Sequence, residues 1–202
     1  MEFLRNIIEA VLFASKEAMT LEAMQAVFPS GQAPEEKALR EILLEIKNDY
    51  ASRGLELVEV SSGFRFQVRS AFSPWVSRLW DEKPARYSRA LLETLSLIAY
   101  RQPITRGEIE AIRGVSVSSH IIKTLTDRNW IRVIGYRELP GRPALFATTK
   151  IFLDYFNLRS LGELPTLQEI REWRSIEDKW PQGSSFQLQE KAESSDLPFL
   201  SS

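Results

Sequence analysis

The 202-residue chain contains no cysteine. This absence excludes a disulfide framework, thiolate metal ligands and a cysteine nucleophile, and it favours a reducing, cytosolic compartment. The sequence holds a single histidine, His120, and one such side chain cannot hold a metal ion by itself. Its nine glycines are scattered and form neither a GxxxxGK[ST] phosphate loop nor a GxGxxG fingerprint. We therefore expect no enzyme activity, no catalytic residues, no metal and no cofactor.

Long apolar runs are also missing. No stretch approaches the roughly 18 uninterrupted apolar residues of a membrane span. The apolar amino terminus is interrupted by Glu2, Glu9, Lys16 and Glu17, and no small-residue cleavage pattern follows it. We interpret this segment as an amphipathic helix and not as a signal peptide. The sequence predicts a soluble, cytoplasmic protein with no membrane partner.

Charge is unevenly distributed along the chain, although the formal net charge is only −1. Residues 1–80 carry 9 Lys and Arg against 11 Asp and Glu, and residues 88–150 carry 10 against 5. Residues 151–202 return to an acidic balance, with 5 against 9. The middle of the chain is thus a cationic region between acidic flanks, which indicates an anionic partner.

A helix-turn-helix pattern occurs twice, 85 residues apart. AVLFASKEAMTLEAMQAV (10–27) and LSLIAYRQPITRGEIEAI (95–112) align without a gap, which matches Phe13 with Ile98 and Thr20 with Thr105. A repeat of this length is typical of two copies of one small domain.

The first copy reads as three helices followed by a hairpin. Apolar residues recur at helical spacing along the first helix, at Phe3, Leu4, Ile7, Ile8, Val11 and Leu12. A second helix is predicted over 21–28 behind Thr20, and a third over 34–53 with Gly54 as its C-cap. LELVEV and FRFQVR, on either side of SSG, predict two paired strands.

The second copy repeats this plan. Ser88 is expected to cap a helix that runs to about Tyr100, and Thr105 a helix that ends at Gly114, with Glu108 closing a capping box. A third helix over 117–129, strands over 130–138 and 144–148, and a short helix over 150–156 complete it.

The predicted fold class is mainly α with small β wings, in two tandem winged-helix domains. The domains span 1–80 and 88–165, with a linker over 81–87. A helical extension is expected over 166–180. Residues 181–202 are polar and rich in serine, and we expect them to form a disordered tail.

Winged helices often bind DNA through the third helix, so a winged-helix transcription regulator is the alternative function. The third helix of the first copy, however, carries more acidic than basic residues and would repel phosphates. Its counterpart in the second copy lacks the Arg or Asn forks that read base edges. We expect at most weak, non-specific DNA binding.

The first helix of each copy carries more apolar residues than one small core needs. Phe13 lies outside the apolar stripe, and the second copy holds a run of leucines and isoleucine at Leu91, Leu92, Leu95, Leu97 and Ile98. Such a surplus fits packing between the domains, a dimer, or a partner helix in a groove. The residues we expect at a dimer interface are Phe3, Ile7 and Phe13.

The surplus positive charge of the second copy lies largely in arginines. These side chains suit either phosphates or an acidic protein segment. The residues we expect to bind a protein partner are Arg101, Arg106, Arg137 and Arg142.

Four stretches together resemble the segregation and condensation protein B family over about residues 1–165. They are RGLELVEVSSGFRFQVR (53–69), AYRQPITRGEIEAIRGV (99–115), GYRELPGRPALFATT (135–149) and FLDYFNLRSLGELP (152–165). The resemblance implies a non-catalytic accessory subunit of the bacterial structural-maintenance-of-chromosomes (SMC) complex, which acts in chromosome condensation and segregation.

The resemblance also implies partners and a location. Family members have two winged-helix domains, form homodimers through the amino-terminal one, and clasp the kleisin subunit, segregation and condensation protein A. The kleisin bridges the heads of the SMC ATPase, so the ATP site belongs to that partner. The chain is therefore expected to be cytoplasmic and associated with the nucleoid.

Overall fold

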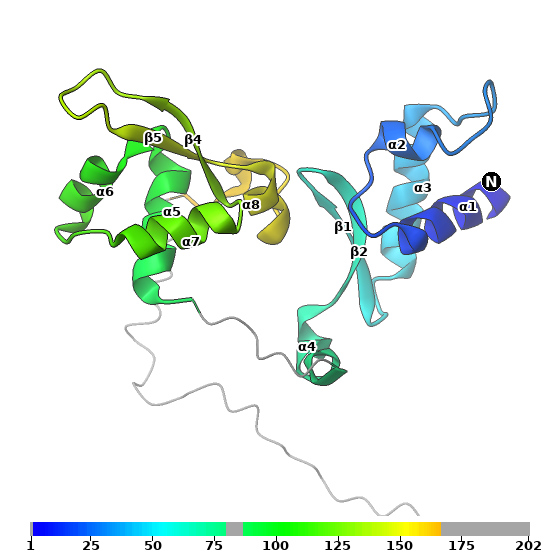
Figure 1. Ribbon diagram of the computed structural model, residues 1–202. Coiled ribbons are helices and arrows are strands. Elements are labelled where there is room, and N and C mark those ends of the chain that lie inside the picture. Colours follow the sequence, from blue (N-terminus) through cyan, green and yellow to red (C-terminus); the bar gives the residue numbers. More distant parts are fainter. Residues whose placement is uncertain (1, 80–86, 167–202) are drawn as a thin grey trace, which may run out of the picture. The chain divides into compact units, whose positions relative to one another are not determined.

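The computed structural model describes residues 2–79 and 87–166 (Figure 1). These residues form two modules, each built from helices and a small antiparallel sheet. The predicted fold class, mainly α with small β wings, is confirmed. The predicted linker lies outside the described residues except for Tyr87, and so do the helical extension beyond Thr166 and the tail.

The first module has the predicted order of elements. They are α1 (Glu2–Ala14), α2 (Leu21–Gln25), α3 (Glu36–Asp49), β1 (Leu55–Val60) and β2 (Gly63–Val68). The third helix is shorter than the predicted 34–53, because Tyr50 and not Gly54 is its C-cap. Three helices and the hairpin enclose one core, formed by Ile8, Leu12, Leu21, Met24, Leu39, Ile42, Leu43, Ile46, Tyr50 and Leu57.

A backbone bridge ties the segment before α2 to the hairpin. The N–H of Met19 donates to the carbonyl of Phe64 at 2.9 Å, and the N–H of Phe64 donates to the carbonyl of Met19 at 2.8 Å. Gly63 next to this bridge has φ +124°, and a Cβ there would lie 2.2 Å from the carbonyl oxygen of Met19. Only glycine fits this crossing.

Three short helical turns follow the hairpin, and the sequence reasoning missed them. They are η1 (Ser70–Phe72), α4 (Ser73–Val76) and η2 (Ser77–Leu79). Pro74 stands in the first turn of α4, where its missing N–H costs no hydrogen bond. These turns leave Phe72, Trp75 and Leu79 exposed.

The second module has the predicted elements and one additional strand. They are α5 (Arg89–Arg101), β3 (Ile104–Thr105), α6 (Arg106–Arg113), α7 (Ser119–Asp127), β4 (Ile131–Tyr136), β5 (Ala144–Thr148), α8 (Lys150–Tyr155) and η3 (Leu161–Glu163). The predicted caps Ser88 and Thr105 are confirmed, as is the capping box with Glu108. Gly114 ends α6 in the left-handed region, at φ +71°.

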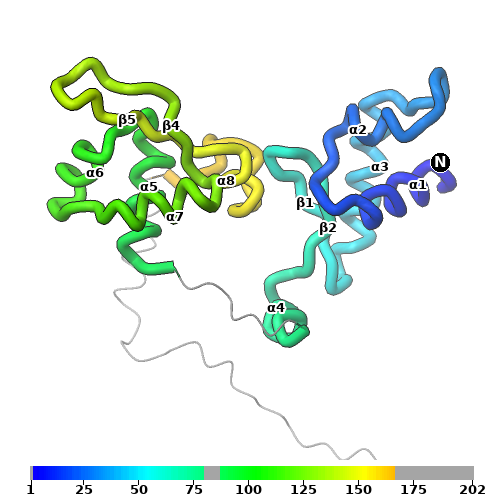
Figure 2. Tube along the Cα trace, viewed as in Figure 1, coloured from blue at the N-terminus to red at the C-terminus, as the bar shows by residue number. Residues whose placement is uncertain are grey.

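The second sheet has the strand order β3-β5-β4, and all pairs are antiparallel. The trace in Figure 2 passes from β4 through the turn at 137–143 into β5 and then directly into α8. A bulge between Val133 and Gly135 shifts the register of β4 against β5. The core under this sheet centres on Trp130, which is 2% exposed, and on Ile98, Ile109 and Leu125.

Polar contacts connect the turn of the first hairpin with the end of α8. Asp154 accepts hydrogen bonds from the N–H of Ser62 at 2.9 Å and from its hydroxyl at 2.5 Å. Arg65 donates to the carbonyl of Asp154 at 2.8 Å, and the N–H of Ser61 donates to the carbonyl of Leu158 at 2.9 Å. These contacts join residues about 90 positions apart, and neither segment carries a sequence pattern that predicts them.

Candidate partner-binding surfaces

Helix α1 presents an exposed, uncharged stripe with two phenylalanines on its outer side. Phe3 is 79% exposed and Phe13 is 47% exposed, and Asn6 and Ala10 between them are exposed as well. These positions follow one another at helical spacing and therefore share one face. Ile7 at the border of this face is half-buried. The structure thus brings the three predicted dimer residues to one side of α1, and their role in a dimer stays a prediction.

The inner side of α1 is held by contacts to α3 and β2. Arg5 forms an ion pair with Asp49, and the hydroxyl of Tyr50 donates to Glu9 at 2.6 Å. This hydrogen bond to a carboxylate, together with burial, raises the pKa of Tyr50. Phe13 stacks on Phe66 with ring centroids 4.2 Å apart. One face of the Phe13 ring is therefore covered within the module, and the ring is fixed in place.

A cavity of about 280 Å³ lies between α3 and the first hairpin. Its lining residues are Arg40, Leu43, Leu44, Lys47, Leu57, Glu59 and Phe64. This groove was not predicted from the sequence, because it forms only where the folded hairpin lies beside α3. The signal was Leu44, which falls beside the buried stripe of α3 and is 59% exposed.

The structure brings together only two of the four arginines predicted to bind a partner. Arg101 and Arg137 line one cavity of about 390 Å³, together with Pro103, Ile104, Glu108, Ala111 and Ile112. Arg106 and Arg142 do not line it. Arg142 stands in the turn between β4 and β5 with φ +39°, and it is exposed.

The four arginines also differ in how far carboxylates of the fold neutralise them. Arg137 pairs with Glu108 at 2.9 Å, and Arg106 pairs with Glu110 at 3.0 Å. Among the residues that the structure describes, Arg101 and Arg142 form no ion pair. Because an unpaired cation needs no exchange of partners on binding, these two are the more available for an acidic segment.

Hydrogen bonds favour the ionised form of both of these glutamates. The backbone N–H and the hydroxyl of Thr105 lower the pKa of Glu108, and Arg137 adds to the effect. The N–H of Val117 and the side chain of Arg106 lower the pKa of Glu110. At neutral pH Arg106 and Arg137 are therefore held in the fold by charged partners.

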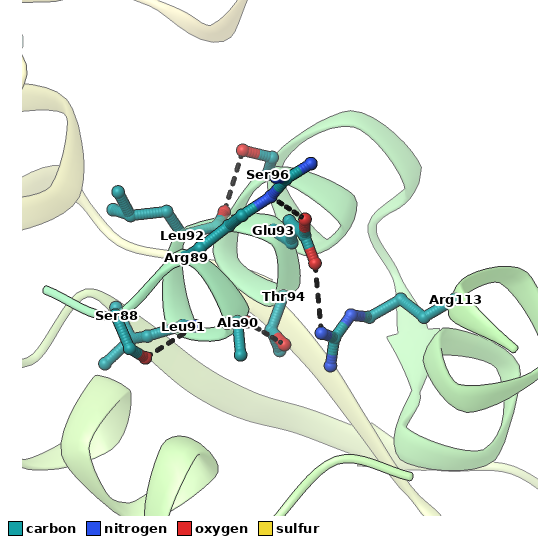
Figure 3. A network of polar contacts seen from close by, with 9 residues as sticks. All are labelled: Ser88, Arg89, Ala90, Leu91, Leu92, Glu93, Thr94, Ser96 and Arg113. Atoms are coloured by element: carbon teal, nitrogen blue, oxygen red, sulfur yellow. Dashed lines mark hydrogen bonds and ion pairs between the residues drawn. The ribbon is translucent and has the colours of Figure 1, made fainter. Parts of the chain in front are cut away.

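Glu93 stands between two further arginines (Figure 3). It accepts from Arg89 at 2.8 Å within α5 and from Arg113 of α6 at 3.0 Å, and these contacts lower its pKa. The side chain of Arg113 is only 9% exposed. Arg113 therefore fixes α6 against α5 and is not available to a partner.

Metal binding and membrane spanning are the two features that the sequence does not predict and that the described residues also lack. There, no group of three or more His, Cys, Asp or Glu residues is arranged to hold a metal ion. Also within those ranges, no helix combines the length and the apolar character that crossing a membrane requires. His120 lies exposed on α7.

Comparison with known proteins finds relatives that extend over both modules. A segregation and condensation protein B homolog of Coxiella burnetii (strain RSA 493 / Nine Mile phase I) is 55% identical over 186 residues, which are 92% of this chain and 89% of that protein. Segregation and condensation protein B of Syntrophotalea carbinolica (strain DSM 2380 / NBRC 103641 / GraBd1) is 41% identical, over 84% of each chain.

Solved structures give a weaker likeness. The crystal structure of a dimer of the ScpB N-terminal domain complexed with ScpA peptide is 26% identical. It covers 39% of this chain and 96% of that one with a TM-score of 0.35, which is too low to establish a shared fold by itself.

The family model described as segregation and condensation complex subunit ScpB matches residues 6–167. That range includes the whole of the second module as the structure describes it and nearly all of the first. The chain therefore belongs to the ScpB family of segregation and condensation complex subunits.

Proposed function

We propose that this chain is a non-catalytic accessory subunit of the bacterial SMC complex. In this function it forms a homodimer through its first module and binds the kleisin subunit, segregation and condensation protein A, largely through its second. It reaches the SMC ATPase only through the kleisin. The observation that carries the proposal is the family match over residues 6–167, because the names of the family and of these relatives refer to a segregation and condensation complex or protein.

The exposed stripe on α1 supports the dimer. Phe3 exposes 79% of its surface to solvent, although burying a phenylalanine stabilises a protein by roughly 1.5–3 kcal/mol. In a twofold dimer the same patch contacts its copy, so the dimer buries each of these aromatic side chains on both protomers. A charged residue in the stripe would oppose such contact, and positions 3, 6, 10 and 13 carry none.

The unpaired arginines of the second module support kleisin binding. Arg101 lines the 390 Å³ cavity beside Ile112, which is 54% exposed. A cation next to an exposed apolar side chain fits a protein segment with acidic and apolar residues. Arg142 is a second exposed cation, in the turn of the second wing and not among the residues that line this cavity.

Binding to the chromosome is assigned to the complex and not to this subunit. The exposed acidic residues of α3, Glu36, Glu41, Glu45 and Asp49, outnumber its exposed basic residues, Lys37, Arg40 and Lys47, and this balance does not favour phosphate contact. We infer a cytoplasmic subunit that associates with the nucleoid through its partners. DNA contacts of the isolated chain are expected to be weak and to fall steeply with salt.

Co-purification with the kleisin, with and without competing DNA, tests the function. We expect a stable complex of the full chain with the kleisin that excess duplex DNA leaves intact. A chain that ignored the kleisin and preferred one DNA sequence by about a thousandfold at physiological salt would establish the regulator instead.

Light scattering of full-length variants tests the dimer. We expect a dimer for the wild type and a monomer for Phe3→Asp, because the variant places a charge within an apolar contact. Phe72→Asp is the matched control, since Phe72 is an exposed aromatic residue of the same module outside α1. A monomeric wild type at tens of micromolar would overturn dimerisation.

A further inference from the structure

Strand β4 forms a free edge of the second sheet. The strand order β3-β5-β4 leaves β4 paired on one side only, and within the described residues no other strand pairs with its outer side. An edge strand presents unpaired N–H and C=O groups to its surroundings. These groups are a template on which a further strand can form.

The side chains of β4 do not protect this edge. Folded proteins usually shield an edge strand with charged residues, prolines or a bulge. Here Val133 is 46%, Ile134 49% and Tyr136 60% exposed, and Arg132 is the only charged residue between Ile131 and Tyr136. The bulge between Val133 and Gly135 is the one protective device, and it leaves apolar side chains exposed on both sides of it.

The first hairpin shows what a protected wing looks like. Its strands β1 and β2 carry Glu56, Glu59, Arg65 and Gln67, and none of their residues is fully exposed. Arg65 and Glu59 also take part in hydrogen bonds or ion pairs with residues of the second module. The exposed apolar edge is therefore particular to the second wing.

The charges around β4 select the occupant. The wing carries Arg132, Arg137 and Arg142 against Glu138, and Arg137 is already paired with Glu108. A second copy of the wing would add its own Arg132, Arg137 and Arg142 to a surface that is already cationic, and the repulsion between these charges would oppose pairing. An extended segment that alternates acidic and apolar residues can pair its carboxylates with Arg132 and Arg142. Its apolar side chains can pack on Val133 and Ile134.

We propose that the outer edge of β4 binds an extended, acidic and apolar segment of the partner protein by adding it to the sheet as a fourth strand. Backbone hydrogen bonds supply the pairing in this mode, and the side chains at Val133, Ile134 and Tyr136 supply specificity. The inference rests on the proposed function, because the partner of the second module is there the kleisin.

Hydrogen exchange of the full chain, alone and with the kleisin subunit, tests the edge. We expect the amides of β4 to exchange at least about tenfold more slowly in the complex, because strand addition protects backbone N–H groups. The amides of β1 serve as the internal reference. A kleisin that binds without slowing exchange in β4 would overturn the inference and leave the proposed function standing. Absence of binding would overturn both.

Two matched variants separate edge pairing from general charge. Ile134→Lys and Val115→Lys each add one positive charge at an exposed apolar residue of the second module, since Ile134 is 49% and Val115 55% exposed. We expect Ile134→Lys to weaken kleisin binding by about tenfold despite the added cation, and Val115→Lys to keep it within about twofold. Circular dichroism confirms the fold of both. Equal affinities of the two variants would remove β4 from the interface.

Discussion

The connection between the first two helices differs between the modules. Residues 15–19 lie between α1 and the capping Thr20, whereas only residues 102–104 lie between α5 and the capping Thr105. The ungapped alignment of the two repeats is therefore correct at the caps and wrong over the first helices. Burial shows the shift: Phe13 is 47% exposed, whereas its aligned partner Ile98 is fully buried.

The shift determines which of the two first helices, α1 or α5, keeps apolar side chains exposed. In α5 the residues Leu91, Leu95 and Ile98 are buried in the module's own core, so the expected surplus there reduces to Leu92 and part of Leu97. In α1 the aromatic residues Phe3 and Phe13 stay outside. The first helix thus carries exposed aromatic residues in the first module only, whereas the second module exposes apolar residues on its wing, such as Ile134 and Tyr136.

The largest effect we predict is a loss of unfolding free energy in the second module alone. Trp130 is 2% exposed and contacts the rings of Tyr87, Tyr155 and Phe156 at centroid distances of 5.1, 4.6 and 5.4 Å. Trp130→Ala should cost the second module about 3–5 kcal/mol of unfolding free energy through the cavity it leaves. Urea unfolding followed by circular dichroism should then show an early transition.

The first module and its dimer should be unaffected by this change. Trp75→Ala is the control, because Trp75 is 62% exposed and its loss should change the unfolding free energy by about 0.5 kcal/mol or less. If both variants destabilised the chain equally, the second core would not centre on Trp130.

Charge reversal of two arginines sharpens the comparison between free and paired cations. Arg142→Glu should weaken kleisin binding by on the order of 2 kcal/mol, since attraction to an acidic segment becomes repulsion. Arg106→Glu should weaken it less, because Glu110 and the hydroxyl of Ser119 already engage Arg106. Calorimetric titration of the kleisin into each variant measures the difference. An unchanged affinity for Arg142→Glu would exclude the wing turn from the interface.

The helix caps give a smaller, matched comparison. Thr20 and Thr105 each accept a hydrogen bond from the backbone N–H three residues later in the chain. That residue is Ala23 in the first module and Glu108 in the second, and only Glu108 has a side chain that returns a hydrogen bond to the cap. Thr105→Ala should therefore cost up to about 2 kcal/mol and Thr20→Ala about 1 kcal/mol.

Thermal unfolding of both alanine variants measures these costs, and Thr→Ser at each site serves as the control that keeps the hydroxyl. A larger loss for Thr20→Ala would show that the capping box adds nothing to the stability of α6.

The sequence was most informative where a local rule decides the structure. The N-caps Thr20, Ser88 and Thr105, the hairpin of the first module and Gly114 follow from hydrogen bonds or backbone freedom within a few residues, and these were predicted. The C-cap predicted at Gly54 was wrong, because α3 already ends at Tyr50. Strand β3 was not, because two residues carry no periodic pattern and form a strand only through pairing with Leu145 and Phe146. The pairing of Arg137 with Glu108 was missed for the same reason, since it joins residues 29 positions apart.

The candidate surfaces could be predicted in part. A side chain outside the apolar stripe of its helix, such as Phe13, follows from helical periodicity. Whether a cation is free depends instead on which carboxylate the fold places beside it. Sequence reasoning therefore treated Arg101 and Arg106 alike, although Glu110 neutralises only Arg106.

The smallest effect we predict is a pH dependence that belongs mainly to the second module. The pKa of Glu108 is lowered from its usual 4.5 by the N–H and hydroxyl of Thr105, and the pKa values of Glu93 and Glu110 are lowered as well. A carboxyl whose pKa is depressed on folding contributes stability that is fully present above pH 4.5 and is lost as the pH falls through its folded-state pKa. In the first module the same direction is found at Glu22.

Acid unfolding should therefore begin in the second module, at pH values below 4.5. Glu108→Gln keeps a capping-box acceptor but does not titrate. This variant should therefore have a lower unfolding free energy than the wild type at neutral pH, and a smaller further decrease on acidification. Circular dichroism between neutral pH and pH 3, compared with the wild type, measures the slope. Parallel acid profiles for the two proteins would show that the charge of Glu108 does not stabilise α6, and that the two modules differ in their capping geometry alone.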